Sequence, residues 1–188
     1  MKTSLGAETI VYPTPVFIVG SYDAEGRPNL MNAAWGGICS SAPPSVAVSI
    51  RPSRKTYDNI VGSQAFTVNV PSVEHVKQAD YVGIHSGRDG DKFEATGLTP
   101  VKSDLVNAPY VAEFPLVLEC KVLQAFDLGA HVEFVGEILD VKAEEGVLNA
   151  EGKIDVGKLE PFIFSPSDTG YYRVGEFIGQ AFSIGKKL

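Results

Sequence analysis

The sequence predicts a mostly β protein, a single domain over residues 1–188 that folds as a closed or nearly closed antiparallel barrel with a few short helices. Segments rich in β-branched or aromatic residues are short and end at turn formers. The 19 glycines and 12 prolines are spread throughout, so no linker divides the chain. Barrel closure also removes the edges that an open sheet of this size would expose.

A long antiparallel hairpin is the clearest expected element, over residues 116–141. Apolar residues alternate there with Glu119 and Lys121, which predicts a strand with one solvent-exposed face. The sequence FDLGAH then reverses the chain, and Gly129 can adopt a positive φ. The other expected strands are 16–20 (VFIVG), 44–50 (PSVAVSI), 65–70 (AFTVNV), 161–165 (PFIFS) and 179–185 (GQAFSIG).

Helical signals are few. One helix is expected over residues 56–61, ended by Gly62. A second is expected over roughly 73–82, with Ser72 as its N-cap. A third short turn of helix is expected over residues 91–95, before Gly97.

Composition restricts the possible functions. A formal net charge of −7 argues against a broad nucleic-acid or anionic-membrane surface, although a small anion needs only a local positive site. No apolar stretch is long enough to span a bilayer, and the N-terminus lacks a signal-peptide core, so we expect a cytoplasmic protein. The cysteines and histidines show no disulfide, thiol-redox or metal-ligand spacing, and neither GxGxxG nor GxxxxGK[ST] occurs.

The segment SIRPSRKTYDNI, residues 49–60, predicts an anion site. Pro52 ends the preceding strand and a helix follows, and a helix N-terminus offers unpaired N–H groups and a partial positive charge. Ser53 and Thr56 add hydroxyl donors, while Arg51 and Arg54 add forks that suit phosphate oxygens. A solvated basic turn is the alternative.

A stretch of small residues lies upstream, over residues 29–45. It contains the only tryptophan, Trp35, and small residues allow backbone amides to approach a flat ligand. Asn29 and Asn32 have the chemistry to hydrogen-bond the edge of a heterocycle. The alternative is that Trp35 belongs to the core.

Several segments together resemble a known family. In order they are NLMNAAWGGICSSAPPSVAVSIRPSRKTYDNI, FTVNVPS, SGRDGDKFEATGLTP and GAHVEFVGEI. This order is similar to that of the flavin reductase-like family of FMN-binding split barrels, and most similar to its flavoredoxin group, from about residue 10 to 185. The resemblance implies a Greek-key split β-barrel that forms a homodimer and binds FMN non-covalently near the subunit interface.

The resemblance also implies roles for individual residues. The FMN phosphate and ribityl chain would contact Ser49, Arg51, Ser53, Arg54, Lys55 and Thr56. The ring would lie against Asn32, Ala33, Ala34, Trp35, Ser40 and Ser41, with Asn29 at a polar ring edge and Phe164 as an aromatic wall. Lys92 and His131 match basic residues beside the flavin and are the candidates for tuning it.

Each of the last three assignments has a structural alternative. Lys92 lies between acidic residues and could form a solvated ion-pair turn of little energetic value. His131, at a strand start, could be an ordinary structural histidine, and Phe164 could belong to the core. No metal ligands are expected.

Two redox functions follow from the resemblance. In the first, FMN stays bound and the protein transfers electrons between partners such as ferredoxin. In the second, the protein is an NAD(P)H:flavin oxidoreductase, since family members bind the nicotinamide directly against the flavin. A third reading is a non-redox binding module that reuses the same barrel.

Overall fold

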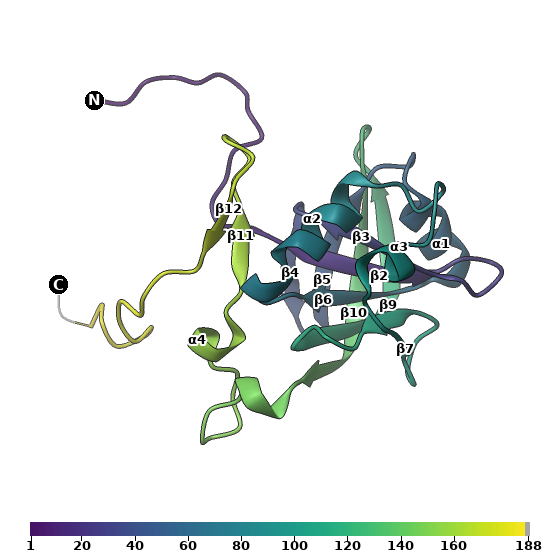
Figure 1. Ribbon diagram of the computed structural model, residues 1–188. Helices are drawn as coiled ribbons and strands as arrows, with labels where there is room; N and C mark the ends of the chain where they lie inside the picture. Colours follow the sequence, from purple (N-terminus) through teal and green to yellow (C-terminus); the bar gives the residue numbers. More distant parts are fainter. Residues whose placement is uncertain (187–188) are drawn as a thin grey trace.

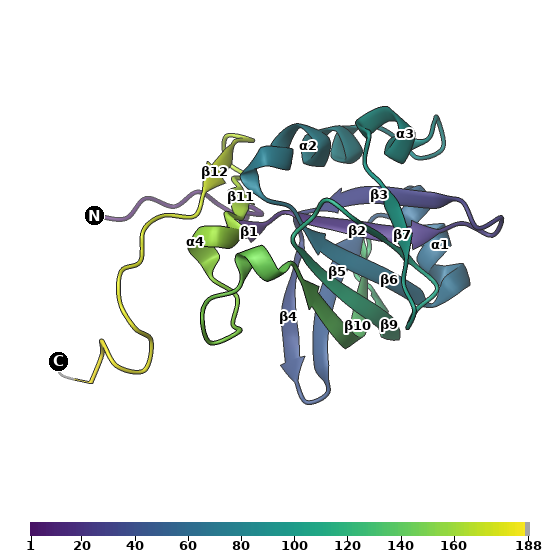
Figure 2. The ribbon, with the colours of Figure 1, turned by 60° about the horizontal axis from the view of Figure 1, so that its bottom comes forward.

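The computed structural model describes residues 1–186, in which one seven-stranded antiparallel sheet curls into a barrel (Figures 1 and 2). Its strand order is β3-β2-β6-β9-β10-β5-β4. The strands are β2 (Phe17–Tyr22), β3 (Pro28–Ala33), β4 (Gly36–Ser41), β5 (Pro44–Ile50), β6 (Ala65–Val70), β9 (Leu116–Asp127) and β10 (Val132–Ala143).

Two small sheets and several helices accompany the barrel. The helices are α1 (Lys55–Ser63), α2 (Val76–Ile84), α3 (Lys92–Thr96) and α4 (Val156–Leu159), with 3-10 turns η1 (Val73–His75) and η2 (Glu145–Val147). The small sheets pair β1 (Thr14–Pro15), β11 (Phe162–Phe164) and β12 (Tyr171–Arg173), and separately β7 (Pro100–Lys102) and β8 (Pro109–Val111). None of the helices in residues 1–186 is long and apolar enough to cross a membrane.

The connections of the barrel follow the expected Greek key. Strands β6, β9 and β10 are successive neighbours in the sheet, and β5, which precedes them in the chain, lies beside β10. The chain therefore leaves β5 on one side of the sheet and re-enters at β6 on the other, through α1. This crossover places the start of α1 at an open end of the barrel, next to the end of β5.

Most expected strands are confirmed, because their patterns are strong. Strands β5 and β6 have the expected bounds, and the long hairpin is β9–β10, with Gly129 at a φ of +85°. The expected strand at 179–185 is wrong: the segment consists of turns, and Phe182 is almost fully exposed at a φ of +61°. No neighbouring strand pairs with that segment, so its backbone groups gain nothing from extension.

The helix ends differ from the expected ones in two places. Gly62 lies inside α1, which continues to Ser63 and ends at Gln64 in the left-handed conformation. Ser72 makes no side-chain capping hydrogen bond, and a 3-10 turn precedes α2. Asp91 does cap α3, since its carboxylate accepts from the backbone N–H groups of Phe93 and Glu94.

The hairpin has an unexpected buried charge at Glu119. We expected this side chain on a solvent-exposed face, but it is fully buried, with the carboxylate 2.7 Å from the ammonium of Lys142 on the neighbouring strand β10. Its other oxygen, Oε1, has no hydrogen-bond partner. The prediction failed because β9 is a central strand whose charge is neutralised across the sheet rather than by water.

Two apolar clusters hold the barrel and its helices together. Val19, Phe66 and Phe134 belong to the first cluster, which draws on β2, β6 and β10. In the second, Leu30 of β3 packs with residues of α2 and α3, which cover one side of β3 (Figure 2). The second cluster fixes the distance between β3 and the segment that joins α2 to α3, and this segment forms one wall of the site described next.

Candidate functional site

The start of α1 is a positively polarised backbone terminus without a side-chain cap. Strand β5 ends at Ile50, and Arg54 occupies the N-cap position with an extended backbone and no capping hydrogen bond from its side chain. The first N–H groups of the helix are therefore available to a ligand. Ser53 is exposed in the turn that leads into the helix.

Two arginines beside this terminus carry unneutralised charge. Arg51 and Arg54 are both exposed, and within residues 1–186 neither forms an ion pair. Lys55 differs, because its ammonium is 3.0 Å from the carboxylate of Asp23 in the turn between β2 and β3. The side chain of Lys55 is thus directed away from the arginines, and only its backbone N–H remains for an anion.

Lys92 is a buried cation rather than part of a solvated ion-pair turn. It is only 5% exposed, and its ammonium donates to the backbone carbonyls of Leu30 (2.8 Å) and Val82 (2.7 Å), which ties β3 to α2. An ammonium has three N–H donors, so one remains for another acceptor. Burial, together with the nearby charge of Arg54, lowers the pKa of Lys92 to about 8.

A buried hydrogen bond joins β3 to α1 at the same place. The carboxamide of Asn29 donates to the hydroxyl oxygen of Thr56 over 2.8 Å, and both side chains are buried. Because this oxygen accepts from Asn29, the hydroxyl hydrogen of Thr56 is free to be donated elsewhere. Asn29, Thr56, Arg54 and Lys92 all line one small cavity between β3, α1 and the segment after α2.

The cavity continues into a longer groove. Arg54 also borders a second hollow of about 140 Å³, lined by residues 31–35 together with Ser49, Arg51 and His131. Trp35, Ser49 and His131 in turn border a third, mostly apolar hollow of about 440 Å³. The groove therefore runs from Lys92 past the two arginines to Trp35 and His131.

Most ring-side residues expected from the sequence lie along this groove. Trp35 is half-buried and is not a core residue, and its backbone carbonyl accepts from the N–H of Ser49 over 2.8 Å. The carboxamide of Asn32 donates to the carbonyl of Ala79 on α2 over 3.0 Å. Ala34 is half-buried, whereas Ala33 is buried in the barrel core, so only its backbone can face a ligand.

His131 lies opposite Trp35, at the start of β10. Burial and the positive charge of Arg51 lower the pKa of His131, so its imidazole is kept neutral to lower pH than usual. A neutral imidazole offers one donor and one acceptor to a ligand in the groove. The sequence reasoning missed Met31, Leu128 and residues 8–11, which line the groove but carry no polar signal.

Three expected residues are not brought to the groove within this chain. Ser40 and Ser41 lie where β4 turns into β5, and the rise of ~3.3 Å per strand residue separates them from Ile50 by roughly 20 Å. Phe164 belongs to β11, where its ring lies 5.9 Å from that of Tyr171 and packs against the second core cluster. The placement of these residues against a ring of the same chain is therefore not supported.

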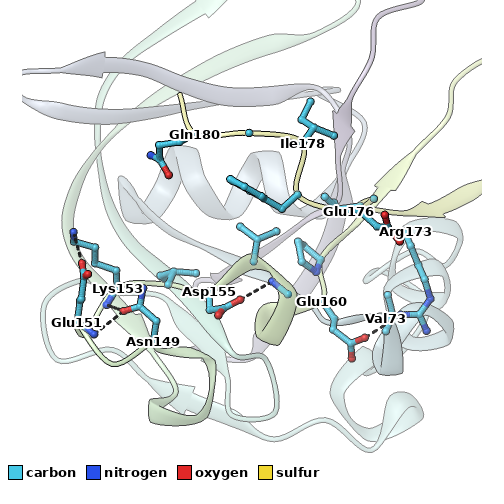
Figure 3. Close-up of a pocket in the computed structure, with 18 residues that line it drawn as sticks. Val73, Asn149, Glu151, Lys153, Asp155, Glu160, Arg173, Glu176, Ile178 and Gln180 are labelled. Carbon is cyan, nitrogen blue, oxygen red and sulfur yellow. Dashed lines mark hydrogen bonds and ion pairs between the residues drawn. The ribbon is translucent and has the colours of Figure 1, made fainter. Parts of the chain in front are cut away.

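The largest cavity lies elsewhere. It measures about 1120 Å³ and is bordered by residues around α4 and by the C-terminal tail, as Figure 3 shows for Asp155, Glu160 and Ile178. None of the expected ligand-binding residues lines it. Within residues 1–186, no cluster of three or more histidine, cysteine or acidic side chains is placed to hold a metal.

Comparison with known proteins decides the family. A family model described as the flavin reductase like domain matches residues 9–167. The chain belongs to the flavin reductase-like family. Its fold is the split barrel of that family.

Three solved flavin reductase-like structures illustrate the similarity. Flavoredoxin of Desulfovibrio vulgaris (Miyazaki F) is 52% identical, with a TM-score of 0.95 over 99% of this chain and 100% of that one. Flavoredoxin from Methanosarcina acetivorans is 32% identical, with a TM-score of 0.93 over 99% and 98%. A putative flavin reductase with a split barrel domain from Shewanella frigidimarina is 27% identical, with a TM-score of 0.81 over 90% and 86%.

Proposed function

We propose that the groove binds FMN, with the phosphate between Arg54, Lys92, Thr56 and the first N–H groups of α1. The observation that carries this proposal is the concentration of positive charge without a carboxylate partner. Arg54 forms no ion pair within residues 1–186, and the ammonium of Lys92 contacts only neutral carbonyls. Two cations facing one cavity repel each other, and a dianion between them removes that repulsion.

The rest of the groove suits the remainder of FMN. Ser49 and Arg51 follow the phosphate seat along the second hollow, and Trp35 and His131 flank its far end. The apolar character of the third hollow matches the dimethylbenzene side of an isoalloxazine ring. When bound, FMN supplies the redox chemistry, and the chain's own residues orient it and set its electrostatic surroundings.

We further propose that the protein is an electron-transfer flavoprotein, as the name flavoredoxin implies for its two relatives. Its partner would be a redox protein such as ferredoxin. An NAD(P)H:flavin oxidoreductase is the second candidate, and the apolar hollow beside Trp35 favours it because a nicotinamide ring would fit there. Location in the cytoplasm stays a prediction.

We also propose that two copies of the chain associate. The N- and C-terminal segments extend away from the barrel (Figure 1), and the tail exposes Phe177, Ile178 and Phe182 at 81–97%. Such large apolar side chains are seldom left in water when a second surface can cover them. A second copy would cover them and would bring additional residues toward the groove.

An anaerobic reductive titration tests the proposed function. The purified protein is expected to be yellow and to contain one FMN per chain, with rapid bleaching by reduced ferredoxin and slow bleaching by NADH or NADPH. Fast bleaching by a nicotinamide nucleotide alone would support the reductase instead. A colourless protein that does not take up FMN would refute both.

Replacing Lys92 by methionine tests whether this cation tunes the flavin. Reduction places negative charge on the flavin, and a nearby ammonium stabilises that charge, so the Lys92→Met variant should have a lower reduction potential. The measurement is a dye-coupled redox titration of the FMN-loaded variant. His131→Gln serves as the comparison at the other end of the groove, and an unchanged potential in Lys92→Met would remove Lys92 from this role.

A further inference from the structure

The segment between α2 and α3 lies unusually close to Asn29. A β-carbon added at Gly87 would lie 2.9 Å from Cγ of Asn29 and closer still to Oδ1. Contacts this short do not occur between ordinary side chains, so only glycine permits the present arrangement. The φ of Gly87 is not in the left-handed region, so an alanine there has no backbone strain and would act only through this contact.

Asn29 cannot move without losing its only side-chain hydrogen bond to α1. Its carboxamide donates to Thr56, and both side chains are buried, so no water replaces the bond at the same site. The segment around Gly87 is itself held in a turn, in which the N–H of Asp89 donates to the carbonyl of Ser86 and the N–H of Arg88 donates to the Ser86 hydroxyl. An added methyl group would therefore displace the carboxamide rather than the turn.

The direction of the Thr56 hydroxyl depends on this contact. While Asn29 donates to the hydroxyl oxygen, the hydroxyl must donate its own hydrogen elsewhere, and the small cavity shared with Arg54 and Lys92 lies beside it. If the carboxamide rotates, its oxygen can accept from Thr56 instead, and the hydrogen is then withdrawn from the cavity. Asn29 thus decides whether Thr56 acts as a donor to an anion.

We propose that Gly87 is a positioning residue for the phosphate of the flavin, which it serves by holding Asn29 against Thr56. This inference rests on the proposed FMN site and adds a residue that touches neither the phosphate nor any charged group. It assigns Asn29 to the phosphate end of the groove, where the structure places it, rather than to the edge of the ring.

The test compares FMN with riboflavin, which lacks the phosphate. In Gly87→Ala, the dissociation constant for FMN should rise about tenfold, because one hydrogen bond to a charged group is lost. The dissociation constant for riboflavin should not change. Both are measured by quenching of flavin fluorescence. Gly90→Ala is the matched control, since Gly90 lies in the same segment and a β-carbon there meets nothing within 4 Å.

A double-mutant cycle separates positioning from general damage. Asn29→Ala removes the group that alanine at position 87 would strike, so adding Gly87→Ala to Asn29→Ala should cost no further FMN affinity. Additive losses, or a Gly87→Ala variant that binds FMN like the natural protein, would overturn the proposal. If the natural protein binds riboflavin as tightly as FMN, the phosphate seat itself is wrong, which is a separate failure.

Discussion

Replacing Arg54 by alanine is expected to weaken FMN binding by one to two orders of magnitude. The guanidinium is the one exposed cation that borders both the small cavity and the adjoining hollow, and no carboxylate within residues 1–186 neutralises it. A hydrogen bond to a charged group contributes ~1.5–3 kcal/mol, which corresponds to about 10- to 150-fold in the dissociation constant. Fluorescence titration of the apoprotein measures the change.

The control for Arg54→Ala is an arginine of similar exposure outside the groove. Arg173 pairs with Glu160 near β12, and Arg173→Ala should leave FMN affinity unchanged. Riboflavin affinity should be almost the same in both variants, because the loss concerns the phosphate. An Arg54→Ala protein that retains FMN at moderate salt would place the phosphate elsewhere in the groove.

FMN affinity is expected to fall as the pH rises above about 8. Lys92 loses its proton near that pH in the free protein, and a phosphate dianion binds the protonated ammonium better. Each pH unit above 8 should therefore weaken binding by up to tenfold, until the higher pKa of Lys92 in the complex is reached. Lys92→Met should bind more weakly below pH 8 and should lack this decline.

The same titration affects the stability of the apoprotein in the opposite sense. The pKa of Lys92 is lowered in the folded chain from its usual 10.5 to about 8, so between these values the unfolded chain binds more protons. The free energy of unfolding should therefore rise with pH across this interval, by about 3 kcal/mol at most. Urea denaturation at pH 7.5 and pH 10 measures it, and a Lys92→Met protein with the same rise would contradict the assignment.

The anion seat was predictable because its main signal is local. In SIRPSRKTYDNI, a strand end, two arginines and a helix start follow one another, and each part predicts the same chemistry. Strands β5 and β6 were equally clear from their β-branched residues. Strands β3 and β4 were missed because their small and polar residues suit a ligand loop as well as a strand.

Non-local contacts explain what the sequence did not predict. Lys92 lies between Asp89 and Asp91 in the chain, which suggested a solvated turn, but Asp91 caps α3 and the ammonium reaches the carbonyl of Leu30 in β3. Glu119 has the pattern of an exposed residue, yet its partner Lys142 arrives only when β10 pairs with β9. Neither partner is visible without the register of the barrel.

The seat at the start of α1 collects its groups from β3, from α1 and from the segment between α2 and α3. A partly formed chain has no such assembly, so the ligand has affinity for the finished molecule alone. We therefore expect the intracellular supply of FMN to govern how long each copy survives proteolysis, since saturation at one hundred times the dissociation constant lowers the unfolded fraction about a hundredfold.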